Sequence, residues 1–194
     1  MAVNVKNLPH HFYTLEEYFA LERAGQARYE YWNGEIVCMS GGTRKHATII
    51  GNVYFSLRSQ LTEPGFTAFT SHLAIKTPSL PPYRYPNVSV VCGTPAFENI
   101  EATDALTNPT LIVEVLSPGT ESLDRKEKRV AYQALASLME YVLIAQDVPH
   151  ITHFVRKGDI WVRSDYADTT ASVSLPSVGC SLAFSDVYSE VEFE

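Results

Sequence analysis

One acidic residue inside a strongly apolar strand constrains this chain more than any other feature. The segment Leu111–Leu116 has the sequence LIVEVL and ends at Ser117-Pro118-Gly119, which predicts a short strand buried on both faces. Glu114 lies in its middle. An ionised carboxylate there costs several kcal/mol, roughly, unless a cation meets it. The fold must therefore bring a metal ion, a lysine or an arginine to Glu114.

Composition limits the classes of protein to which the chain can belong. Its 194 residues suffice for one domain with a sizeable core, so we expect an N-terminal arm over 1–12 and a single domain over 13–194. The formal net charge of −7 argues against a protein that mainly coats nucleic acid, but it leaves room for a nuclease whose acidic site recruits metal. The three cysteines lack CxxC spacing, which disfavours a zinc ribbon or a disulfide framework. Without a signal-peptide core or a long apolar run, a cytoplasmic protein with no membrane partner is expected.

Local signals predict the elements of the first half. Thr14 and Glu17 have capping-box spacing, and Asn33-Gly34 between two β-type runs predicts a hairpin. The expected elements, in order, are a helix at about 15–24 that stops at Gly25, strands at about 28–32 and 35–39, a helix that carries Ile49, Val53 and Leu57 and ends at 63–65, one or two strands over 66–77 with a bend near 71–72, a rigid and exposed proline-rich loop over 78–86, a strand over 87–91, and a long polar connection over 92–108.

The second half predicts a strand–helix–strand unit over 110–145, which implies a right-handed crossover and a parallel pair of strands. Asp124, Lys128 and Tyr132 share one face of the helix, at i, i+4 and i+8. Its apolar stripe is expected to consist of Val130, Ala131, Ala134, Leu135 and Leu138. A strand at about 139–146, a hairpin that turns at 157–159, and a final edge strand or short helix follow. The whole is a mixed-sheet α/β domain with helices on both sides.

Five segments match a known family pattern in the same order. They are YEYWNGEIVCMS, the histidine after the next polar turn (His46), YPNVSVV, PTLIVEVLSPGTESLDRKEKRVAYQ and EYVLI. Together they resemble the PD-(D/E)XK nuclease superfamily and, within it, the bacterial Uma-two family of endonucleases. The resemblance extends from YTLEEYFAL through MEYVLIAQ. It implies an α/β fold with a restriction-endonuclease-like core, in which a mixed central β-sheet is flanked by helices.

The resemblance also implies roles for particular residues. Glu30 and Glu35 fill the two glutamate positions of the first motif, and Glu114 fills that of the Glu-Val-x-Ser motif. The motif lysine of the superfamily would fall at Leu116, which cannot serve. By resemblance, the Asp-Arg-x-x-x-Lys segment of the next helix provides that lysine, which is Lys128 here.

The residue types at these positions suit a divalent metal. Carboxylates that converge on one point bind Mg²⁺, a hard cation that prefers oxygen ligands and retains waters. By resemblance, the catalytic residues are Glu114, Lys128, Asn87 and Glu30, the metal ligands are Glu114, Asn87 and Glu30, and the cofactor is Mg²⁺ or Mn²⁺. Lys128 would stabilise the charge that develops on the phosphate.

Asn87 departs from the family pattern, which has Pro-Asp where this chain has Pro86-Asn87. An amide oxygen can ligate a cation, but the site loses about one unit of negative charge, which weakens binding of a hard cation. Three interpretations follow. The site works through Glu30 and Glu114, the protein binds nucleic acid without cutting it, or the substitution is particular to this chain.

Each main candidate also has a structural interpretation. Glu114 could form a buried ion pair with a lysine or an arginine. Glu30 could be a surface carboxylate opposed by Arg28 or Lys45, and Asn87 could simply start a strand after a proline.

Several further residues are lesser candidates. Arg44, Lys45 and His46 lie near the start of the second helix, where an N-terminus favours anions, and could contact substrate phosphate. His46 could equally be a capping or exposed residue. Gln133, one turn beyond Lys128, could lie at the rim of the site, and Glu35 is expected to be solvated.

The predicted function is therefore Mg²⁺-dependent endonucleolytic hydrolysis of DNA phosphodiester bonds, weakened by Asn87. The alternative is a catalytically inactive, nuclease-derived nucleic-acid-binding or interaction module, which Asn87 and the acidic net charge favour. An acid–base enzyme for a small metabolite ranks last because the chain has no GxGxxG motif or phosphate-cradling glycine loop. The resemblance also implies a homodimer whose two sites address two DNA strands.

Overall fold

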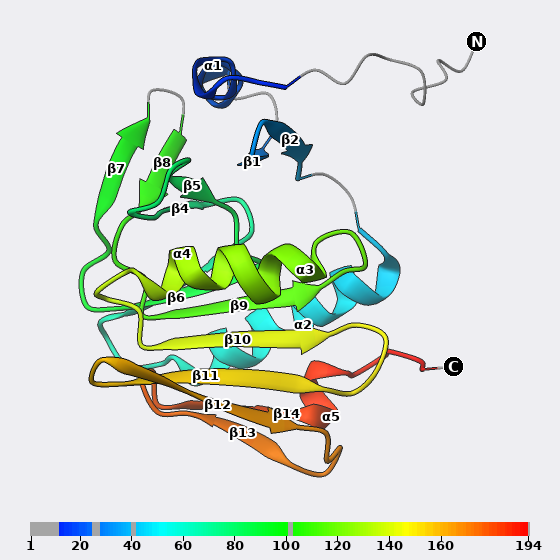
Figure 1. Ribbon diagram of the computed structural model, residues 1–194. Coiled ribbons are helices and arrows are strands. Elements are labelled where there is room, and N and C mark those ends of the chain that lie inside the picture. The colour runs from blue at the N-terminus through cyan, green and yellow to red at the C-terminus, as the bar shows by residue number, and fades with distance from the viewer. Residues whose placement is uncertain (1–11, 25–27, 40–41, 101–102, 194) are drawn as a thin grey trace.

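The strand that carries Glu114 lies in the middle of a six-stranded mixed sheet in the computed structural model, which describes residues 12–24, 28–39, 42–100 and 103–193 (Figure 1). β9 (Leu111–Leu116) pairs in parallel with β10 (Glu140–Ala145), and all six of its side chains are buried. The predicted parallel pair and doubly buried strand are thus confirmed. The sheet order is β12-β11-β10-β9-β6-β3, where the other strands are β3 (Phe66–Thr70), β6 (Val88–Cys92), β11 (Ile151–Lys157) and β12 (Ile160–Tyr166).

Helices cover both faces of this sheet, as predicted. On one face lies α2 (Arg44–Gln60), whose buried Ile49, Val53 and Leu57 pack against alternate residues of β6, β9 and β10. The same core includes residues of three C-terminal elements: β13 (Ser172–Leu175), β14 (Cys180–Ala183) and α5 (Phe184–Val187). The crossover helix covers the other face and consists of α3 (Glu121–Leu123), a π-helical segment η2 (Asp124–Lys128) and α4 (Arg129–Gln133).

The crossover helix ends at Gln133, although the predicted apolar stripe continues to Leu138. Val130 and Ala134 are exposed, although Ala131, Leu135 and Leu138 are buried, so the predicted apolar stripe is wrong at two positions. The π segment changes the angular spacing of the side chains, which turns later positions away from an α-helical stripe. The guanidinium of Arg156 donates to the carbonyl oxygens of Gln133, Leu135 and Leu138, which satisfies acceptors that a longer helix would have used internally.

The predicted N-terminal elements are present. α1 (Leu15–Ala24) begins with the capping box, in which Glu17 N donates to Thr14 Oγ1 and Thr14 N donates to Glu17 Oε2. β1 (Tyr29–Trp32) and β2 (Glu35–Cys38) form the hairpin, with positive φ at both turn residues, Asn33 and Gly34. The expected arm over 1–12, apart from residue 12, and the expected stop at Gly25 lie outside the described residues.

A second, smaller sheet corrects two predictions. The proline-rich loop is not wholly exposed, because it contains β5 (Tyr83–Arg84) and is buried over 83–86. The long polar connection over 92–108, for which no strand was predicted, contains β7 (Phe97–Ile100) and β8 (Thr103–Leu106). These strands join β4 (Ala74–Lys76) in the order β5-β4-β8-β7. β5 pairs with nearby β4 and β7 with the adjacent β8, and the parallel pairing of β8 with the distant β4 joins the two hairpins into one sheet.

None of the helices in the described part of the chain has the length and apolar character needed to cross a membrane.

Candidate functional site

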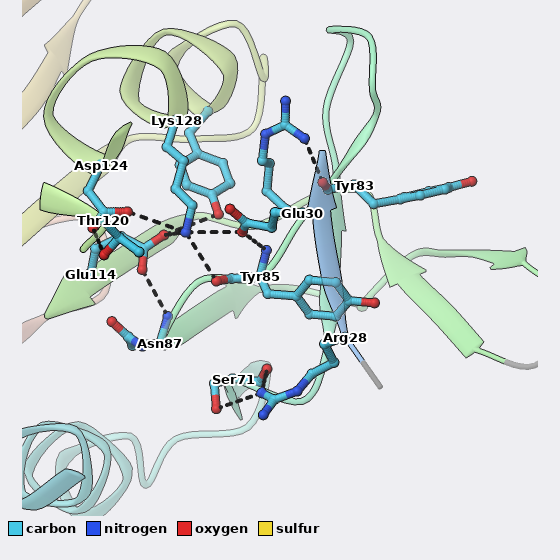
Figure 2. Close-up of polar contacts among 12 residues, drawn as sticks. Arg28, Glu30, Ser71, Tyr83, Tyr85, Asn87, Glu114, Thr120, Asp124 and Lys128 are labelled. Atoms are coloured by element: carbon cyan, nitrogen blue, oxygen red, sulfur yellow. Dashed lines mark hydrogen bonds and ion pairs between the residues drawn. The ribbon is translucent and has the colours of Figure 1, made fainter. Parts of the chain in front are cut away.

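Four residues singled out in the sequence come together at one end of the central sheet (Figure 2). Glu114 projects from β9, Asn87 immediately precedes β6, Glu30 belongs to β1, and Lys128 ends the π segment. Because side chains alternate along a strand, Glu114 faces the crossover helix, on the same side as Ile112, whereas its neighbour Val115 faces the α2 side. The buried carboxylate therefore points at the helix that carries Lys128.

The ammonium group of Lys128 is the centre of this cluster. Its Nζ lies 3.0 Å from Glu30 Oε1, 3.1 Å from Glu114 Oε1 and 3.3 Å from Asp124 Oδ1, and the side chain is only 1% exposed. Burial alone would lower the pKa of Lys128, but the three carboxylates outweigh it and raise that pKa well above its ordinary value. Lys128 is thus a permanent cation here, suited to stabilising negative charge and unsuited to accepting a proton.

Glu114 has a strongly perturbed carboxyl group. Burial, opposed by Lys128 and reinforced by the charges of Asp124 and Glu30, raises the pKa of its carboxyl to about 8. Its Oε1 accepts hydrogen bonds from Lys128 and from Tyr132 Oη, and its Oε2 accepts one from the backbone N of Asn87. The structural interpretation, an ion pair with lysine, is therefore realised, but one ammonium shared among three acids does not fully neutralise Glu114.

Asn87 ties the two central strands together beside Glu114. Its Oδ1 accepts a hydrogen bond from Val115 N at 2.6 Å, while its own N donates to Glu114. The register between β6 and β9 ends at the pair Val88↔Val113, so the side chain of Asn87 takes over where strand pairing stops. The amide of Asn87 fits this position because its oxygen accepts the hydrogen bond from Val115 N. A carboxylate oxygen at the same position could accept that bond equally well.

Glu30 and Asp124 hold Lys128 from the side of the protein interior. Glu30 is 1% exposed and its Oε1 also accepts a hydrogen bond from Tyr85 N, so its interpretation as a surface carboxylate is wrong. Asp124, whose Oδ2 accepts a hydrogen bond from Thr120 Oγ1, was absent from the predicted site. Burial raises the pKa of Asp124 as well, although Lys128 opposes this. The i, i+4 spacing of Asp124 and Lys128 was the signal that could have identified it.

A cavity of about 480 Å³ opens beside this cluster. Glu114, Asn87 and Lys128 line it, whereas Glu30 and Asp124 are not among its lining residues. Its remaining polar lining comes from several elements and includes Arg28, His46, Ser71, Ser117 and Thr120. The cavity therefore exposes one carboxylate, one amide and one ammonium group of the cluster to a ligand.

His46, on α2, forms part of the cavity wall beside β9. Its backbone N donates to Thr43 Oγ1, the N-cap of α2, and its Nε2 lies 2.9 Å from Val115 O. A carbonyl can only accept, so Nε2 carries the proton and Nδ1 is the acceptor. Burial lowers the pKa of His46, which favours the neutral ring.

The other predicted substrate contacts lie apart from the cavity. Arg44 is exposed, the Lys45 ammonium lies 5.8 Å from the ring centroid of Phe193, and Gln133 is on α4. None of these three residues is among the described residues that line the cavity. Their contact with substrate stays a prediction. Glu35 is exposed, as expected.

Arg28 is a cavity residue that sequence reasoning assigned to no ligand. Its Nη1 donates to Ser71 O at 2.6 Å and to Ser71 Oγ at 3.3 Å, and Figure 2 shows this pair on the side of Asn87 away from Lys128. The two bonds fix a guanidinium at the cavity. Only the tertiary contact between residues 43 positions apart could reveal this role.

The chemistry of the donors suits a hard divalent cation. Among the described residues, no three His, Cys, Asp or Glu side chains are grouped as metal ligands. The oxygens of Glu114 and Asn87 nevertheless line one cavity, and Mg²⁺ commonly uses one or two protein oxygens together with waters and substrate phosphate. The incompletely neutralised carboxyl of Glu114 fits such an ion, and metal ligation by Glu30 stays a prediction.

Comparisons with known proteins agree with this architecture. A family model described as "Uma2: Putative restriction endonuclease" matches residues 15–185. Two proteins of Synechocystis sp., "Uncharacterized protein slr1290" and "Uncharacterized protein sll1609", are 30% identical over 92% of this chain and 28% identical over 82% of it, and the alignments cover 92% and 90% of those proteins. The crystal structure of a "putative nuclease belonging to DUF820" from Anabaena variabilis superposes with a TM-score of 0.72 at 20% identity, covering 93% of this chain and 99% of that one, and so shares the fold. The chain belongs to the Uma2 family of restriction-endonuclease-like proteins.

Proposed function

We propose that this protein is an endonuclease that hydrolyses phosphodiester bonds of DNA with Mg²⁺ or Mn²⁺, at the cavity beside Glu114. The observation that carries the proposal is a buried, incompletely neutralised carboxyl on a central strand, with a lysine 3.1 Å away and a cavity beside both. Membership in a family of restriction-endonuclease-like proteins, which generally use divalent metals, supports it. A homodimer that addresses two strands belongs to the same proposal.

The residues have distinct parts in this proposal. Glu114 and the amide oxygen of Asn87 would hold the metal, which when bound supplies a polarised phosphate and a more acidic water. Lys128, kept protonated by its carboxylate neighbours, would stabilise the negative charge that develops on the phosphate. Glu30 and Asp124 keep Lys128 in place through ion pairs of 3.0 and 3.3 Å.

The second candidate is a nuclease-derived module that binds nucleic acid without cutting it. Asn87 favours this candidate because its amide oxygen already accepts a short hydrogen bond from Val115 N and adds no charge. Plasmid nicking with and without Mg²⁺ separates the two candidates. Wild-type nicking that Glu114→Ala abolishes would support the enzyme, whereas DNA binding without nicking by either wild type or Asn87→Asp would support the module.

Asn87→Asp is expected to increase Mg²⁺-dependent nicking about tenfold or more, because the added charge strengthens binding of a hard cation. An aspartate can still accept the hydrogen bond from Val115 N, so the fold should tolerate the change. Initial rates of plasmid relaxation, measured over a range of Mg²⁺ concentrations, would show the increase as a lower half-saturating concentration.

Asn108→Asp is the matched control, since it adds the same charge in a loop away from the cavity lining, and an aspartate can still accept the hydrogen bond that Ala96 N donates there. A half-saturating Mg²⁺ concentration that falls equally in both variants, or in neither, would contradict ligation by residue 87.

Arg28→Gln is expected to weaken DNA binding about tenfold in a chelating buffer. Without metal, Lys128 is shared by three carboxylates and His46 favours its neutral form, so Arg28 is the cation best placed to bind a ground-state phosphate among the described residues that line the cavity. Its two bonds to Ser71 hold the guanidinium ready, which limits the entropy lost on binding. Fluorescence anisotropy with a labelled duplex would measure the affinity as a function of salt.

The loss of one phosphate contact should also reduce the slope of log affinity against log salt by about 0.9. Arg58→Gln removes the same charge from an exposed position of α2 outside the cavity lining and should leave the slope unchanged. Equal slopes for the two variants would refute a phosphate contact by Arg28.

A further inference from the structure

A second cavity, of about 630 Å³, lies close to the first and shares none of its lining residues. Consecutive residues line the two cavities. Tyr85 lines the first and Arg84 the second, and Lys128 lines the first and Arg129 the second. The size lies within the range of small-ligand sites. Nothing in the nuclease proposal uses this cavity.

The wall of the second cavity combines aromatic, apolar and cationic groups. Tyr31 and Trp32 come from the β1–β2 hairpin, Leu80 from the proline-rich loop and Val130 from α4. Leu80 is 76% exposed and Val130 63% exposed, so both side chains present apolar surface at this cavity. These groups offer flat and apolar surface to the body of a ligand.

Arg84 supplies a buried cation beneath this surface. The residue is 3% exposed, its guanidinium lies 4.2 Å from the ring centroid of Trp32, and its Nη1 donates to Tyr83 O. Arg84 Nε and Trp32 Nε1 are both buried donors without a hydrogen-bond partner in the described part of the chain. Burial lowers the pKa of Arg84, although the charge of Glu30 opposes this, and no carboxylate of the described residues lies within ion-pair distance of Arg84. An unpaired buried cation is costly, and an anion would relieve that cost.

The rim of the second cavity is positively charged, like Arg84. Lys126 and Arg129 line it together with one carboxylate, Glu127, so that cations outnumber acids around the opening. The Arg129 guanidinium lies over Phe154, which leaves Lys126 and Arg84 as the groups best placed for an anion. This local excess stands out in a chain with a formal net charge of −7.

We infer that the second cavity binds a mononucleotide unit, with the base against Trp32, Leu80 and Val130 and the phosphate toward Arg84 and Lys126. A nucleotide complements both parts of the lining, because its base offers a flat π surface to the aromatic and apolar side chains and its phosphate offers a negative charge to the cations. The unit can be a free nucleoside monophosphate or one residue of a single strand. The inference requires neither metal nor phosphodiester hydrolysis.

Tryptophan fluorescence in a chelating buffer tests the inference separately from any nuclease activity. The chain has two tryptophans, so Trp161→Phe leaves Trp32 as the sole reporter, and excitation at the red edge of its absorption avoids the bases. Titration with dAMP, with deoxyadenosine, with inorganic phosphate and with a short dA oligonucleotide should give saturable quenching with dAMP or the oligonucleotide. Deoxyadenosine and inorganic phosphate should bind at least about tenfold more weakly.

Val130→Asp, in the same background, should weaken the quenching at least about tenfold, because it places a negative charge at the cavity. Val148→Asp is the matched control, with the same substitution at a 57% exposed valine outside this cavity. Binding of the oligonucleotide but not of dAMP would show that the site takes a residue of a nucleic-acid strand. Binding of both ligands would show that it also takes free nucleotides. No quenching by either ligand, equal quenching in the two aspartate variants, or deoxyadenosine that binds as tightly as dAMP would overturn the inference.

Discussion

Lys128→Met is expected to lower the free energy of unfolding by about 3–5 kcal/mol at neutral pH. The change removes the ammonium that lies within 3.3 Å of three buried carboxylates and leaves their charges without a counter-ion. Methionine fills a similar volume, so the loss reflects charge rather than a cavity. Urea unfolding followed by circular dichroism would measure the difference, and the same variant should lose nicking activity.

The stability that Lys128→Met loses should depend on pH. Without the ammonium the folded-state pKa values of Glu114 and Asp124 should rise further above their unfolded values. Stability from such groups is fully present below the unfolded pKa and is lost as the pH rises through the folded pKa. The deficit of Lys128→Met should therefore be small at about pH 4 and grow toward pH 9.

Lys126→Met is the matched control, since it removes an exposed lysine two positions earlier in the same segment, and it should change stability by less than about 0.5 kcal/mol. If Lys128→Met does not fold at neutral pH, the double variant with Glu30→Gln should recover part of the stability by removing one uncompensated charge. A Lys128→Met protein as stable as Lys126→Met at every pH would refute the central role of the ammonium.

Local sequence signals were sufficient for the parts of the site that lie on one element. The apolar run around Glu114 predicted a buried acid, and the i, i+4, i+8 spacing predicted that Lys128 shares a face with Asp124 and Tyr132. Both signals depend on periodicity, which the sequence contains directly. The capping box of α1 and the Asn33-Gly34 turn are of the same kind.

The missing parts depend on contacts between distant segments. Phe97–Ile100, whose composition has little alternation, forms a hairpin with the adjacent β8, and only the pairing of β8 with the distant β4 brings this hairpin into a sheet. The bond from Arg28 to Ser71 and the bond from Val115 N to Asn87 join segments whose proximity only the folded chain determines. The burial of Glu30 has the same origin, since it follows from docking of the hairpin against Lys128.

Glu114→Gln is expected to reduce Mg²⁺-dependent nicking to background while stabilising the metal-free protein at alkaline pH. With a folded pKa of about 8, above the unfolded value, Glu114 supports the fold fully only below about pH 4.3. Wild-type stability should therefore fall by up to about 1.4 kcal/mol per pH unit as the pH rises from there to about 8. Glutamine does not titrate, so the variant lacks this loss, and Lys128 keeps Glu30 and Asp124 as partners.

The two stability curves should cross. Glutamine loses the hydrogen bond that Glu114 Oε2 accepts from Asn87 N, which costs about 1 kcal/mol at every pH and makes the variant the weaker protein in acid. Urea unfolding from about pH 3.5 to pH 9 in a chelating buffer would locate the crossing, with Glu63→Gln, an exposed acid, as a control that should run parallel to wild type. Parallel curves for Glu114→Gln would contradict the raised pKa, and nicking retained above about a tenth of the wild-type rate would contradict the metal-binding role. A crossing together with lost activity would mean that this chain retains, at the centre of its sheet, an acid that its fold would be more stable without.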